Sequence, residues 1–144
     1  MSNKSGRIAT LVAAFEGADL DAHYLGYFDY FNSGRFYEAH DVLEQLWLKQ
    51  RRQANDLFYK GLIQLAGAFV HLQKGRLRPA GSLFKLAWAN LQKYPHRHER
   101  LDLRAVSALI ERWQGQLEES GYALNPLVSE APPRLGLEAR GGQS

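Results

Sequence analysis

The sequence predicts an all-α protein: a compact bundle of about five helices, built from two tetratricopeptide-like helical hairpins and a C-terminal helix. Apolar residues recur at intervals of three and four along most of the 144-residue chain, and no segment sustains the alternation typical of a strand. A helix–turn–helix motif also occurs twice, with a constant spacing of 41 residues. With 45% hydrophobic residues, the chain has enough apolar side chains for the core of one domain.

Capping and helix-breaking residues set the expected boundaries. Gly34, Gly75 and Pro95 interrupt the helical pattern. Asp56 and Asp102 are each suited to cap the helix that follows. These signals predict helices at residues 20–31, 36–51, 56–74, 79–93 and 102–120. The expected organisation is a partly ordered N-terminal segment (1–19), a helical bundle domain (20–121) and an extended or disordered tail (122–144).

The repeated motif isolates a group of polar residues in its first copy. FNSGRFYEAHDVLEQLW (residues 31–47) aligns with LQKGRLRPAGSLFKLAW (residues 72–88), and each copy joins two helices through a Gly-Arg turn. Two copies are too few for a solenoid, which needs about three or more, so a bundle is the better interpretation. The polar residues of the first copy and their counterparts in the second are Glu38 and Pro79, His40 and Gly81, and Glu44 and Lys85. The repeat therefore does not itself require the acidic residues and the histidine.

The candidate site centres on His40. Each residue of a helix turns by about 100°, so His40 falls within the apolar arc of the second helix. Glu44, one turn later, can reach its imidazole. Glu38 points elsewhere on an ideal helix and joins the group only if the first turn is distorted or another helix packs there. These spacings predict Glu38, His40 and Glu44 as catalytic residues, with Glu44 or Glu38 as ligand or general base.

The third helix carries a matching polar stripe. Lys60, Gln64 and His71 lie on one face, and two small residues between Gln64 and His71 allow another backbone to approach closely. If the second and third helices are neighbours, His71 and Gln64 can meet His40 and Glu44 inside the bundle. We therefore predict His40, Glu44 and His71 as metal ligands, and Lys60 and Gln64 as substrate-binding residues.

Two imidazoles with one or two carboxylates match the ligand set of a zinc, manganese or iron site that keeps a position open for water. A divalent metal in such a site activates water near neutral pH, which favours hydrolysis. The spacing is a weak signal, because the chain has neither an HExxH motif nor the Glu-x-x-His pairs of di-iron bundles. The alternative is a non-catalytic module for protein interaction or homodimerisation. His40 and Glu44 then hydrogen-bond each other, and His71 or Gln64 completes a structural network.

Composition and charge narrow the function classes. The absence of cysteine excludes disulfides, Cys-based zinc sites and thiol catalysis. No apolar run approaches the ~18 residues of a membrane span, so we expect a cytoplasmic protein without membrane association. Residues 16–47 hold seven acids against one base, whereas residues 74–104 hold eight bases against two acids. This polarity favours contacts within the fold or in a homo-oligomer over nucleic-acid binding, because no nucleic-acid motif accompanies it. The sequence does not indicate which small molecule would be the substrate.

The combined motifs resemble a known family. FNSGRFYEAHDVLEQLW and YKGLIQLAGAFVHLQKGRLRPAGSLFKLAWANL, within residues 27–91, are similar to the small all-helical family called domain of unknown function 309. The family pattern maps onto Glu38, His40, Glu44, Trp47, Gly61, Gln64, His71 and Gly75. The resemblance implies a compact helical bundle and brings a loose description as predicted metal-dependent hydrolases, with no substrate attached.

Overall fold

Helices make up most of the structure, a computed structural model that describes residues 4–139. In chain order they are α1 (Lys4–Val12), the 3₁₀ turn η1 (Ala13–Phe15), α2 (Ala22–Asn32), α3 (Phe36–Lys49), α4 (Asp56–Gln73), α5 (Leu77–Leu91), α6 (Leu103–Glu119) and α7 (Pro126–Ser129). Between α5 and α6 the chain forms a short antiparallel pair, β1 (Arg97–His98) and β2 (Leu101–Asp102). The predicted all-α bundle is confirmed. Across the described residues, no helix has both the length and the apolar character that crossing a membrane requires.

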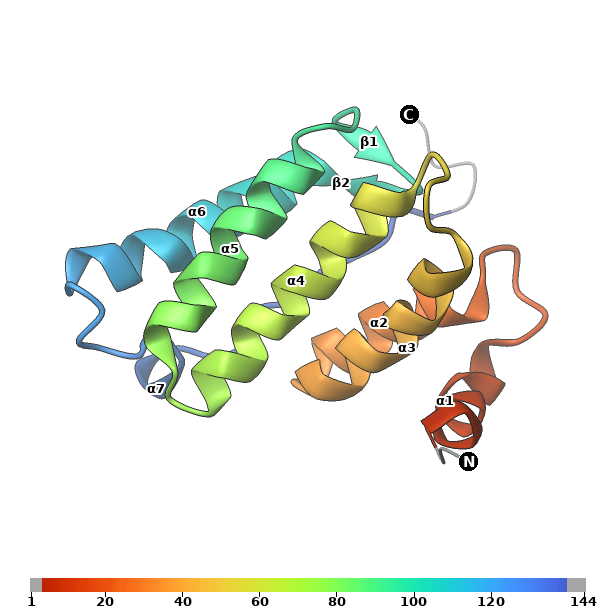
Figure 1. The fold of residues 1–144 in the computed structure, drawn as a ribbon, viewed down its shortest axis with the longest axis horizontal. Helices are drawn as coiled ribbons and strands as arrows, with labels where there is room; N and C mark the ends of the chain where they lie inside the picture. Colours follow the sequence, from red (N-terminus) through yellow and green to blue (C-terminus); the bar gives the residue numbers. More distant parts are fainter. Residues whose placement is uncertain (1–3, 140–144) are drawn as a thin grey trace.

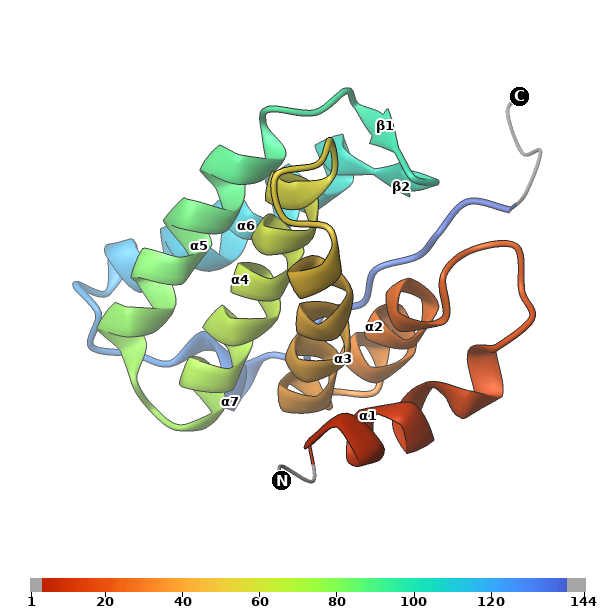
Figure 2. The same cartoon turned by 45° about the vertical axis from the view of Figure 1, so that its right-hand side comes forward.

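The two hairpins pack side by side, with α4 near the middle of the molecule (Figure 1). Within the hairpins α2 packs on α3 and α4 packs on α5, and α3 also contacts α4. The C-terminal helix α6 packs on α5, whereas α1 lies against α2 and α3 at the opposite end, as Figure 2 shows. The first helix of the chain therefore lies beside the helix that carries His40.

The repeated motif is also a repeat of backbone structure. Gly34 and Gly75 occupy corresponding positions and both adopt a left-handed conformation, with φ of 77° and 72°. The matched hydrogen bonds from N–H to C=O run from Gly34 to Phe31 (3.0 Å), Gly75 to Leu72 (3.1 Å), Arg35 to Tyr30 (2.9 Å) and Arg76 to His71 (2.8 Å). Such bonds satisfy carbonyl groups left free at a helix C-terminus. Both joints thus use a glycine turn of the same geometry, while the likeness to tetratricopeptide repeats stays an interpretation.

We expect Gly34→Ala and Gly75→Ala each to lower the free energy of unfolding by about 1–2 kcal/mol, because a Cβ disfavours the left-handed conformation by that amount. Within residues 4–139, no side chain or distant backbone atom lies within 4 Å of a Cβ at either glycine, so the effect comes from the backbone alone. Urea denaturation measures the change. Gly34→Asn is the control, since asparagine tolerates this conformation better. An alanine variant as stable as wild type contradicts the explanation.

Two aspartates at helix starts differ in what they do. Asp102 caps α6 as predicted, because its side chain accepts hydrogen bonds from two amides of the first turn. The prediction for Asp56 is wrong: Asn55 holds the N-cap position of α4, and Asp56 is the first helical residue. Its carboxylate accepts hydrogen bonds from the indole of Trp47 (2.7 Å) and the amide of Arg52 (2.6 Å). These donors come from α3 and the loop after it, so Asp56 joins two helices instead of capping one.

Residues 122–139 run back along the bundle. Beyond α7 the chain is extended, and the side chain of Asn32 exchanges two hydrogen bonds of 2.6 Å with the backbone of Leu135. Leu135 is itself buried, so this part of the predicted tail packs against the helices. The predicted N-terminal and tail segments also include residues 1–3 and 140–144, which lie outside the described residues.

Candidate functional site

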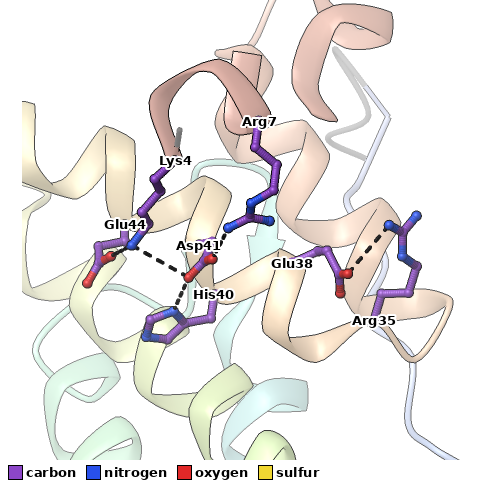
Figure 3. Close-up of polar contacts among 7 residues, drawn as sticks. All are labelled: Lys4, Arg7, Arg35, Glu38, His40, Asp41 and Glu44. Atoms are coloured by element: carbon purple, nitrogen blue, oxygen red, sulfur yellow. Dashed lines mark hydrogen bonds and ion pairs between the residues drawn. The ribbon is translucent and has the colours of Figure 1, made fainter. Parts of the chain in front are cut away.

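Three potential metal-binding side chains meet on α3: His40, Asp41 and Glu44 (Figure 3). Each offers one ligand atom, and these atoms all lie within 4.8 Å of one another. Helical spacing accounts for His40 and Glu44, which are one turn apart. Asp41 is an addition to the predicted set, and it connects the group to α1.

Asp41 is the buried member of the group, with 2% of its surface exposed. Its Oδ1 lies 3.0 Å from Nδ1 of His40, and its Oδ2 accepts a hydrogen bond of 2.5 Å from Arg7 on α1. Burial by itself raises the pKa of Asp41, but the hydrogen bonds from Arg7 and His40 and the charge of Lys4 lower this pKa below its ordinary value. Asp41 is therefore a carboxylate at neutral pH.

Lys4, at the first position of α1, brings a second cation to the group. Its ammonium donates a hydrogen bond of 2.8 Å to Oε1 of Glu44 and lies 3.8 Å from Oδ1 of Asp41. The hydrogen bond to Glu44 raises the pKa of Lys4, burial opposes that change, and the charge of Asp41 adds to it. Lys4 and Arg7 together balance the charges of the two carboxylates.

The imidazole of His40 has one nitrogen engaged and one available. Nδ1 lies 3.0 Å from Oδ1 of Asp41, and no hydrogen bond between the described residues uses the other ring nitrogen. The side chain is 30% exposed. On the α4 side its neighbour is Gly67, where an added Cβ would lie 3.9 Å from Cδ2 of His40. A carboxylate on one nitrogen orients an imidazole so that the other nitrogen can bind a metal or accept a proton.

Two of the predicted residues lie apart from this group. Glu38 forms an ion pair of 3.6 Å with Arg35, the residue before α3, and in Figure 3 its side chain points away from His40. His71 is not among the clustered ligands of the described chain. Its Nδ1 is buried and has no hydrogen-bond partner among residues 4–139. Burial, followed by the charges of Arg76 and Lys74, lowers the pKa of His71. The catalytic role of Glu38 and the metal-ligand role of His71 stay predictions.

The predicted substrate-binding residues make other contacts. Gln64 accepts a hydrogen bond of 2.8 Å from Asn90 on α5. The ammonium of Lys60 lies 5.9 Å from the centre of the Trp47 ring. Both residues share the helical face of Gly67, which is next to His40. Their roles toward a substrate are untested predictions.

The structural network differs from the one that the sequence suggested. His40 bonds to Asp41 and not to Glu44, because the carboxylate of Glu44 turns toward Lys4. Asp41 directly follows His40 in the string EAHDVLEQLW, so its identity was visible but its burial was not. Arg7 could not be paired with it from the sequence, since no local spacing connects residues 34 positions apart.

The comparisons with known proteins agree with the helical motif. Residues 24–83 match the family described as Domain of unknown function (DUF309). An uncharacterized protein from Aquifex aeolicus (strain VF5) is 28% identical over 87 residues, covering 60% of this chain and 26% of the relative. This chain thus spans about a quarter of the length of the curated relative it matches. No solved structure gives a significant match. The resemblance to domain of unknown function 309 is therefore confirmed, over residues 24–83 of this chain.

Proposed function

We propose that His40, Asp41 and Glu44 bind a divalent metal and form the centre of a hydrolase-type active site. The observation that supports this most directly is the position of the Lys4 ammonium, which contacts Glu44 Oε1 at 2.8 Å and approaches Asp41 Oδ1 at 3.8 Å. Two carboxylates thus already hold a cation, and the imidazole of His40 lies 3.0 Å from one of them. The hydrolase class comes from the description attached to the family resemblance.

The donor chemistry fits such an ion. One imidazole nitrogen and two carboxylate oxygens suit zinc, manganese or ferrous iron, the metals expected from the sequence. Ligand atoms within 4.8 Å of one another need only small side-chain rotations to share an ion with bonds near 2 Å. Once Lys4 has moved away, the two negative charges of Asp41 and Glu44 offset most of the charge of a divalent cation and of Arg7.

The residues have separate expected roles. When bound, the metal supplies Lewis acidity, which lowers the pKa of water and polarises the bond to be hydrolysed. Without a metal, Asp41, fixed by Arg7, holds the imidazole of His40 in one orientation; with a metal bound, Oδ1 of Asp41 would turn from His40 to the ion. Glu44, which is 29% exposed, would act as ligand or general base. Oε1 of Gln64 accepts the hydrogen bond from Asn90, so the amide N–H groups of Gln64 would donate to a substrate oxygen.

Metal titration of chelator-treated protein tests the proposal. Calorimetry with zinc, manganese and ferrous iron should detect binding to wild type. His40→Ala should weaken it by more than the roughly 10–100-fold typical for loss of an outer-shell partner. His96→Ala is the control, since His96 is exposed in the loop between α5 and β1. His71→Ala, run in parallel, decides whether His71 contributes a ligand.

The outcomes separate the possibilities. Binding that is lost in His40→Ala and retained in His96→Ala supports the site and justifies assays on ester, amide and phosphoester substrates. No binding, or equal binding by both variants, rejects it. Circular dichroism of each variant shows whether the fold survives.

The second candidate is a non-catalytic homodimerisation or interaction module. Two observations favour it. Lys4 and Arg7 already neutralise Asp41 and Glu44, and Leu124 and Val128 expose 70% and 83% of their surfaces near α7. Sedimentation equilibrium tests it: a dimer that Val128→Glu dissociates supports this function, whereas a monomer at all concentrations removes homodimerisation.

A further inference from the structure

The helix α1 is attached to the bundle in two different ways. Its apolar side buries Ile8 and Val12, each with 1% of its surface exposed. The hydroxyl of Tyr30 on α2 also donates a hydrogen bond of 2.6 Å to the carbonyl of Leu11. Its polar side reaches the candidate site through residues near its N-terminus. The position of α1 therefore does not depend on the polar contacts alone.

Lys4 and Arg7 contact different oxygen atoms of the two carboxylates, Asp41 and Glu44, as Figure 3 shows. Arg7 is hydrogen-bonded to Oδ2 of Asp41, whereas Lys4 approaches Oδ1 of Asp41 and binds Oε1 of Glu44. Arg7 can therefore remain in place and keep Asp41 oriented while another cation replaces Lys4. The side chain of Lys4 is 44% exposed and starts at the first residue of α1, so it can rotate outward without unpacking the helix.

A metal ion and the Lys4 ammonium cannot share these oxygens. Metal–oxygen bonds are about 2.0–2.2 Å long, so the ion must lie in the space between Asp41 and Glu44 that the ammonium approaches. The two cations also repel each other at that separation. Occupancy by one therefore excludes the other.

We infer that Lys4 is a built-in competitor for the metal, so that the first turn of α1 controls access of the ion to the site. The inference rests on the proposed function, because it concerns the same His40, Asp41 and Glu44 group. Lys4 lowers the apparent metal affinity, and metal binding releases the Lys4 side chain into solvent.

The first test is metal titration of Lys4→Met, which keeps an unbranched side chain of similar length without the charge. Its affinity should exceed that of wild type by on the order of tenfold, the effect of removing one partly screened cation from the site. Lys85→Met is the matched control. Lys85 also pairs with a glutamate, Glu118 at 3.7 Å, but lies on the face of α5 toward α6. Its affinity should stay within twofold of wild type.

A second measurement separates direct displacement from a general charge effect. Amine-reactive labelling of wild type, quantified by mass spectrometry at Lys4 and at Lys85, is compared with and without the metal. Labelling of Lys4 should increase several-fold when metal is added, while labelling of Lys85 stays constant. Unchanged labelling of Lys4 under saturating metal overturns the inference.

The titration also distinguishes failure of the inference from failure of the proposed function. If Lys4→Met and wild type bind metal equally, and His40→Ala does not bind, the metal site stands and the competition is wrong. If Lys4→Met, with its carboxylates no longer paired to an ammonium, binds no metal either, both proposals are wrong. Tighter binding of metal by Lys4→Met than by wild type supports both.

Discussion

Replacing Phe69 by alanine is expected to lower the free energy of unfolding by about 3–5 kcal/mol, the range typical for truncation of a buried phenylalanine. Phe69 lies on α4 and is fully buried. Its ring lies 5.0–5.7 Å, between centroids, from the rings of Phe31, Phe36, Phe84 and Trp113, which come from α2, α3, α5 and α6. The alanine variant loses contacts with four helices at once, and close-packed neighbours cannot fill the cavity completely.

Urea denaturation followed by circular dichroism measures this loss. The control is Tyr37→Ala on α3, where 55% of the side chain surface is exposed, and its effect should remain within about 0.5 kcal/mol. The loss in free energy of unfolding for Phe69→Leu should lie between those of the two alanine variants, because leucine leaves a smaller cavity than alanine. Similar losses for the Phe69 and Tyr37 alanine variants contradict the central position of Phe69.

Gly61→Ala is expected to lower the free energy of unfolding by about 1–3 kcal/mol, as overpacking typically does. A Cβ at Gly61 would lie 2.9 Å from Cγ and Cδ2 of Leu91 and 3.3 Å from Cβ of Asn90. Leu91 is buried, with 1% of its surface exposed, so relieving this overlap disturbs the packing of α4 against α5. The alanine therefore pushes α4 and α5 apart, which also strains the hydrogen bond between Asn90 and Gln64.

Gly115→Ala on α6 is the matched control for Gly61→Ala. In the part of the chain that the structure describes, no atom of another element lies within 4 Å of a Cβ at Gly115. Alanine is favoured over glycine inside a helix by about 0.8–1.0 kcal/mol, so this variant should be more stable than wild type. Helix propensity favours alanine at both positions. A loss of stability at Gly61 beside a gain at Gly115 therefore reports the close approach of α4 and α5. Stabilisation by both substitutions, measured by urea denaturation, contradicts that approach.

The two hairpins share a backbone joint but differ in what covers them. Gly81 occupies the position that corresponds to His40, and a Cβ there would lie 2.7 Å from Cε1 of Tyr122. In the first hairpin, the corresponding region faces α1 and carries Asp41 next to His40. The second hairpin thus excludes a side chain where the first accommodates an imidazole. This difference agrees with the sequence comparison of the two copies, which indicates that the repeat does not itself require a histidine at this position.

Part of the candidate site could be predicted because it depends on local geometry. His40 and Glu44 are one helical turn apart, and Gln64 shares a face with Gly67 by the same periodicity. The burial of Asp41 has a different origin. On an ideal helix it lies about 100° away from His40, and it contacts the cations of α1 only because that helix packs across α3.

By itself, the sequence determined the five helices α2 to α6, the glycine joint at Gly34 and Gly75, and the relationship to domain of unknown function 309. Periodicity, capping and left-handed turns act within a few residues, which is why they can be recognised without a structure. Only the tertiary structure decided that Asp41 is the buried carboxylate and that Lys4 lies against Glu44, 40 positions away. Those pairings depend on how side chains from separate helices meet, and no pattern within one helix specifies them.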